Sequence, residues 1–225
     1  MEKFDEVLAD AIAKRVKNLA WFSEGDVQSE IYSTLMKNEE LNKLIPTKVS
    51  IGKNGNNMLS ETTYDTNCLH REYGIENFPN SRCDLVVFDE CDIKNITDLI
   101  NLKNNNDYLK PKYMIEFGTE KSARTPALFQ EHITNDIKKV KEAKKIGYIV
   151  HIQRAYDEDY KEYCEVLNNL DLTDEKVKVV FLWATIGSDK KRITKSGKIK
   201  LYYKDEKVFK GVNQKDLSQK ILEIL

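Results

Sequence analysis

The sequence has few of the residues that build zinc sites and disulfide frameworks. Its 225 residues include four cysteines and three histidines. No two cysteines form a Cys-x-x-Cys pair, and no cysteine stands at a spacing from histidine that suits zinc. Cys83 lies inside an apolar run, where a cysteine usually packs as a small hydrophobic residue. We therefore expect neither a disulfide scaffold nor a zinc site.

Long apolar runs and an excess of one charge are also missing. No stretch is long and apolar enough to span a bilayer, and the first residues have no signal-peptide pattern, so we expect a cytoplasmic protein without a membrane partner. Lys and Arg number 36, Asp and Glu number 37, and the formal net charge is -1. Global charge therefore does not indicate a nucleic-acid partner, and a binding face has to be a local basic patch.

What is present is typical of a globular protein with a heavily charged surface. Hydrophobic residues make up 40% of the chain and charged residues 32%, which argues against disorder. We predict a single domain over residues 1–225, which is long enough to bury a core. Its parts are N-terminal helices (1–37), an α/β core (65–186) and a C-terminal hairpin and helix (198–225).

The N-terminal part reads as two helices. Apolar residues recur at helical spacing over residues 3–20, and Ser23 with Asp26 three residues later resembles a capping box that opens a second helix. The polar, glycine-containing stretch 37–62 is expected to be a loop or a mobile hairpin. A second polar stretch, residues 90–110, is expected to lie outside the core.

The remaining elements alternate between strands and helices. Thr125-Pro126 is a helix start, because proline is favoured in the first turn. The order strand, helix, strand, helix, strand favours an α/β arrangement with right-handed crossovers. The expected strands are 67–73, 82–89, 112–121, 147–152, 177–185 and a hairpin over 199–208, with a turn at 74–81; the expected helices are 125–145, 157–169 and one from residue 214.

Two strands that are predicted one after the other in the sequence each carry one carboxylate among apolar residues. Side chains alternate along a strand, so Asp84 shares a face with Val86 and Phe88, and Glu116 shares one with Met114. If the strands pair, the two acids meet, and like-charge repulsion is costly unless a cation lies between them. Oxygen ligands of this kind suit Mg²⁺. A single acid on a strand is more often an edge feature, but two in succession, followed by a helix, favour a site.

A third acid lies on the second helix. Glu30 comes three residues after Val27 and four before Thr34, at the border of the buried stripe. A solvated position and a role in a site are both open for it.

Taken together, these elements resemble the PD-(D/E)xK nuclease superfamily. The resemblance covers roughly residues 23–150 and rests on Arg82-Cys-Asp84, Ile115-Glu116-Phe117 and Asn135-Asp136-Ile137-Lys138-Lys139. It implies a restriction-endonuclease-like fold, in which a central mixed β-sheet is flanked by helices on both sides. It also implies Mg²⁺-dependent cleavage of DNA phosphodiester bonds, with Mn²⁺ as a substitute metal.

The resemblance gives roles to individual residues. Asp84, Glu116 and the carbonyl of Phe117 would hold the metal, which lowers the pKa of its bound water and neutralises charge on the phosphate. Glu30 would be an outer ligand or would orient the attacking water. A homodimer or a partner subunit is compatible with the resemblance.

The family lysine is missing from its usual place, two residues after the glutamate. Gly118 stands there. Because a glycine can kink a strand, Lys121 is our candidate for a displaced catalytic lysine; Arg124 and Lys138 are less favoured. The departure leaves open whether the site is active.

Three functions follow. The first is a Mg²⁺-dependent DNA endonuclease, with restriction or another defence against foreign DNA as a compatible role. The second is a catalytically inactive nuclease-fold module that binds nucleic acid or a partner protein, and the third is a structural subunit whose acids only pair.

Several polar residues have an ordinary structural explanation beside a functional one. His70, His132 and His151 are expected to be hydrogen-bonded strand or helix residues, with His132 pairing to Asp136. Arg71-Glu72 is either a cross-strand pair or a contact to the site, and Gln130 either reaches the site or faces water.

Overall fold

One mixed β-sheet forms the centre of the molecule. The computed structural model describes residues 3–16, 23–53, 57–75, 78–94, 109–143, 145–185, 199–202, 207–209 and 214–225. In the sheet, seven strands lie in the order β3-β4-β5-β6-β7-β8-β9. Their bounds are β3 Leu69–Ile75, β4 Phe78–Val87, β5 Tyr113–Thr119, β6 Ile146–Ala155, β7 Val177–Thr185, β8 Ile199–Leu201 and β9 Lys207–Phe209.

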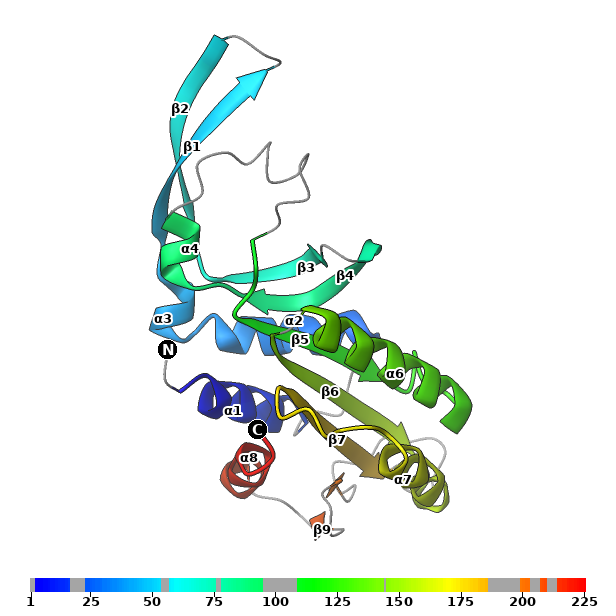
Figure 1. Ribbon diagram of the computed structural model, residues 1–225. Helices are drawn as coiled ribbons and strands as arrows, with labels where there is room; N and C mark the ends of the chain where they lie inside the picture. Colours follow the sequence, from blue (N-terminus) through cyan, green and yellow to red (C-terminus); the bar gives the residue numbers. More distant parts are fainter. Residues whose placement is uncertain are drawn as a thin grey trace.

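Helices cover both faces of this sheet (Figure 1). One apolar cluster joins the sheet to α1 (Phe4–Val16), α2 (Glu24–Leu35) and α8 (Gln214–Leu222), and a second joins it to α6 (Pro126–Ala143) and α7 (Tyr160–Asn168). The prediction of an α/β protein with helices on both sides is therefore confirmed. Within the described ranges, no helix combines the length and the apolar character needed to cross a bilayer.

The parallel half of the sheet follows the predicted order. β5 pairs in parallel with β6, and β6 in parallel with β7. α6 and α7 connect these strands, with a short 3-10 helix, η1 (Asp157–Asp159), before α7. All seven residues of β5 are buried, as expected for a strand with helices on both faces.

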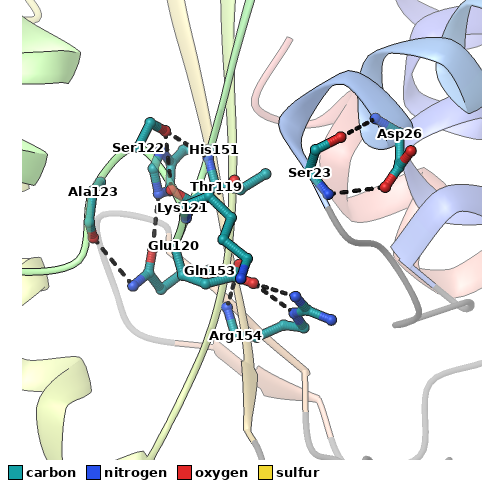
Figure 2. Close-up of polar contacts among 10 residues, drawn as sticks. All are labelled: Ser23, Asp26, Thr119, Glu120, Lys121, Ser122, Ala123, His151, Gln153 and Arg154. Carbon is teal, nitrogen blue, oxygen red and sulfur yellow. Dashed lines mark hydrogen bonds and ion pairs between the residues drawn. The ribbon is translucent and has the colours of Figure 1, made fainter.

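The N-terminal helices also match the expectation, with shorter bounds. The predicted capping box at the start of α2 is present, because Asp26 N donates to Ser23 Oγ at 3.3 Å and Ser23 N donates to Asp26 Oδ2 at 2.8 Å (Figure 2). α1 ends at Val16, and the predicted continuation over 17–20 lies outside the described residues.

Of the two alternatives predicted for the stretch 37–62, a loop or a mobile hairpin, the structure has a hairpin, whereas the turn predicted next is too long. The stretch 37–62 forms the short helix α3 (Glu39–Asn42) and an antiparallel hairpin of β1 (Ile45–Lys53) and β2 (Asn57–Thr66), which projects from the rest of the molecule (Figure 1). The predicted turn at 74–81 is wrong, because β3 continues to Ile75 and β4 already begins at Phe78. The polar stretch 90–110 begins with α4 (Glu90–Lys94), and residues 95–108 lie outside the described ranges.

Candidate active site

The two predicted acids come together where β4 and β5 separate. Their antiparallel pairing ends with Leu85 opposite Ile115, and one position further along the same register places Asp84 opposite Glu116. Instead of a ladder pair, the carboxylate of Asp84 accepts a hydrogen bond from the backbone N–H of Phe117 at 2.7 Å. The acids therefore lie on neighbouring strands at one gap in the sheet.

Helix α6 supplies the charged partners of Glu116, which is only 2% exposed. Lys139 Nζ lies 3.1 Å from Glu116 Oε1 and 3.2 Å from Asp136 Oδ1. His132 Nε2 lies 3.4 Å from Asp136 Oδ2 and 3.3 Å from the carbonyl oxygen of Phe117. Residues 132, 136 and 139 share one face of the helix because they are four and three positions apart. This face of α6 meets the carboxyl half of β5.

The site has more acidic than basic side chains. Lys139 contacts Glu116 and Asp136, and the charges of Asp136 and Asp84 both act on Glu116. Burial raises the pKa of Asp84 to about 7, although the bond from Phe117 N–H opposes this shift. Burial and the charge of Asp136 raise the pKa of Glu116 to about 8, while Lys139 opposes the rise.

The remaining two charged groups respond to the same environment. Burial raises the pKa of Asp136. For Lys139, burial disfavours the ammonium, but the charges of Glu116 and Asp136 outweigh it and raise its pKa. Lys139 is therefore a fixed positive charge, and the three acids hold protons more tightly than exposed acids do.

The structure places Lys139, and not the predicted Lys121, against Glu116. Lys121 is exposed, and its side chain has no hydrogen bond or ion pair with any of the described residues. The less favoured candidates are also turned away: Arg124 is exposed, and Lys138 is 65% exposed and pairs with Glu142.

Close packing explains why position 118 holds glycine. A Cβ on Gly118 would lie 2.2 Å from His151 Nδ1 and 2.8 Å from His132 Nε2. His151 is 1% exposed and cannot move into solvent. The two imidazole rings thus occupy the space through which a side chain at this position would have to pass.

The structure brings Glu24, not the predicted Glu30, toward the site. Ser122 donates its hydroxyl to Glu24 Oε2 at 2.7 Å, and the charge of Glu24 adds to the effect of burial on the pKa of Asp84. Glu30 pairs with Arg15 of α1 at 3.1 Å and is 49% exposed. At roughly 100° per residue, Glu30 lies about 120° around the helix from Glu24.

The turn after β5 is held by its own polar contacts (Figure 2). Thr119 N donates to Ser122 Oγ at 3.2 Å, and the guanidinium of Arg154 at the end of β6 pairs with Glu120. The loop that carries Ser122 is thereby fixed to the carboxyl end of the parallel strands, where α/β proteins commonly place their sites.

The other polar residues singled out in the sequence fall into two groups. His70 Nε2 lies 2.8 Å from the carbonyl oxygen of Asn67, and His151 Nε2 lies 2.9 Å from Gln153 Oε1, so both histidines are hydrogen-bonded as expected. Gln130 is exposed. His132 does pair with Asp136, but this pair belongs to the site.

The donor chemistry of the site fits a hard divalent cation. When all are ionised, the three carboxylates exceed the single ammonium by two charges, and their oxygens are the ligands Mg²⁺ prefers. Across the described ranges, no three histidine, cysteine, aspartate or glutamate side chains converge as a ready metal cage. Mg²⁺ does not require one, because it commonly binds through one or two carboxylates and retains several waters.

Comparisons with known proteins find no likeness. No protein-family model matches the chain, and no curated protein and no solved structure matches it either.

Proposed function

We propose that this protein is a Mg²⁺-dependent DNA endonuclease of the PD-(D/E)xK type, with a restriction-endonuclease-like fold. The observation that carries the proposal is the half-buried Asp84 beside the buried Glu116 at the gap between β4 and β5, with the Lys139 ammonium 3.1 Å from Glu116. Two acids and a lysine are the functional set that the superfamily pattern requires. Here the lysine comes from α6 instead of β5.

Each group has a task in phosphodiester cleavage. Asp84, Glu116 and the carbonyl of Phe117 would hold Mg²⁺ or Mn²⁺, which when bound activates water and neutralises charge on the phosphate. Lys139 presents its ammonium to the charge that develops on the phosphate oxygens. Asp136 positions Lys139 through the 3.2 Å contact.

Isosteric variants test the proposal. Asp84→Asn and Glu116→Gln remove the ionisable oxygens while keeping the side-chain size, and we expect both to abolish Mg²⁺-dependent nicking of supercoiled plasmid. Glu30→Gln is the matched control, because it removes one helix glutamate that pairs with Arg15, and it should cleave like the wild type. Full activity of the Asp84 or Glu116 variant would reject the proposal.

A second candidate is an inactive module that binds nucleic acid or a partner protein. It is favoured by the position of Lys139, whose ammonium already compensates Glu116 and Asp136 at 3.1 and 3.2 Å. Such a module would bind DNA in a salt-sensitive way without Mg²⁺-dependent cleavage. Calorimetry with Mn²⁺ and Mg²⁺ separates the two, since only the nuclease binds metal through Asp84 and Glu116.

A further inference from the structure

The ladder between β3 and β4 is interrupted directly beside Asp84. Arg71 pairs with Leu85 and Tyr73 with Cys83, but Glu72 and Asp84, which lie between them, do not pair. Glu72 has φ 52, the one positive φ among the described non-glycine residues. A glutamate in this left-handed region is strained, and such strain is found most often at functional sites.

A glutamine from α2 takes the place of the missing ladder bond. Phe88 N donates to the carbonyl of Cys68, so these two residues form a hydrogen-bonded pair. Such pairs recur at every second residue of an antiparallel ladder. In a regular ladder, Glu72 and Asp84 would therefore be hydrogen-bonded to each other through their backbones. Instead, Gln28 Nε2 donates to the carbonyl oxygen of Asp84 at 2.9 Å and lies 3.2 Å from Glu72 Oε1. Gln28 is only 5% exposed, so its amide is a buried and fixed group.

The same amide orients an arginine. Arg71 Nη2 donates to Gln28 Oε1 at 3.0 Å, and the Arg71 guanidinium lies 5.6 Å from the centre of the Tyr32 ring. Both nitrogen protons of Gln28 are used by Asp84 and Glu72, which leaves its oxygen for Arg71. The guanidinium is thus held on two sides while the residue stays exposed.

We propose that Arg71 binds a phosphate group of the DNA strand at this site. Two hydrogen bonds through Gln28 connect its guanidinium to the backbone of Asp84, so it is an oriented cation beside the predicted metal ligands. A guanidinium has five donors in a planar fork that matches phosphate oxygens, and Gln28 uses one of them. The left-handed Glu72 permits this, because it frees the Asp84 carbonyl for Gln28. The inference rests on the proposed nuclease function.

The test measures DNA affinity in the absence of cleavage. Wild type, Arg71→Gln and Arg71→Lys are titrated against a fluorescently labelled duplex in EDTA at several salt concentrations, and folding is checked by thermal unfolding. Lys161→Ala is the control, because it removes one positive charge from α7 at a residue that is 87% exposed. We expect Arg71→Gln to bind at least about tenfold more weakly at low salt.

The salt dependence identifies the contact. Loss of one phosphate contact should reduce the slope of log affinity against log salt by about 0.9 for the Arg71→Gln variant. Arg71→Lys should restore the slope, and Lys161→Ala should match the wild type. An unchanged slope in Arg71→Gln, or an equal loss in Lys161→Ala, overturns the role of Arg71.

The outcomes also separate this inference from the function on which it rests. If the wild type nicks plasmid with Mg²⁺ and Arg71→Gln binds DNA normally, only the phosphate contact is refuted. If the wild type neither binds nor nicks DNA, both proposals fail.

Discussion

Asp84→Asn should make the metal-free protein more stable, and increasingly so as the pH rises. Burial raises the pKa of Asp84 from its ordinary 3.8 to about 7. In the unfolded chain the acid loses its proton near pH 4, whereas the folded protein retains it until about pH 7. The folded state therefore binds more protons over this range, and the Asp84 contribution to stability is lost as the pH rises.

The size of the effect follows from the two pKa values. A rise from 3.8 to about 7 corresponds to about 4 kcal/mol. Asparagine can still accept the bond from Phe117 N–H but does not ionise. The free energy of unfolding of the variant minus that of the wild type should thus be small at pH 4 and approach about 4 kcal/mol at pH 8.

Urea unfolding in EDTA across this pH range measures the difference directly. Subtracting the two proteins removes the contributions of His70 and His151, whose pKa values are lowered by burial in both. Loss of the Asp84 charge also reduces the repulsion felt by Glu116, which changes the difference in the same direction. A difference that is flat or falls with pH would refute the assignment of Asp84 as a half-buried carboxylate whose charged form is destabilised.

Three further predictions concern neighbouring residues. Lys139→Met should lower the rate of plasmid nicking by about a hundredfold or more, whereas Lys121→Met should leave it unchanged; equal losses would contradict the placement of the lysine. Gly118→Ala should lower the free energy of unfolding by about 2 kcal/mol in urea titrations because the new methyl group overlaps the His151 ring, and wild-type stability would show that the ring can yield. The free energy of unfolding in urea should be about 1 kcal/mol higher for Glu72→Gly than for Glu72→Ala, because only glycine adopts the positive φ without strain. In an ordinary strand alanine is the more stable of the two, and that order here would mean that the backbone at position 72 is unstrained.

Local chemistry made much of the fold predictable. The Ser23 and Asp26 capping box and the Thr125-Pro126 helix start depend on residues close in sequence, and both mark helix starts in the structure. The sequence predicts that Asp84 and Glu116 meet only if their strands pair, and the structure pairs these strands up to Leu85 and Ile115.

The missed features depend on contacts between distant segments. Lys139 reaches Glu116 only because of the way α6 lies across β5, although helical spacing from Asp136 already distinguished it from Lys138. Glu24 was overlooked because it stands at the first position of α2, where an acid is readily explained by the helix dipole. Its bond to Ser122 becomes visible only when the loop after β5 is in place.

The imidazole rings of His132 and His151, which pack against Gly118, restrict which substitutions position 118 can accept. A side chain at position 118 would require His132 and His151 both to move, and His132 also contacts Asp136, the partner of Lys139. Such a side chain would thus press on His132 and, through it, on Asp136, which contacts Lys139. Substitution of Gly118 and the placement of Lys139 are therefore coupled, and a larger residue at position 118 calls for compensating changes at His132 and His151.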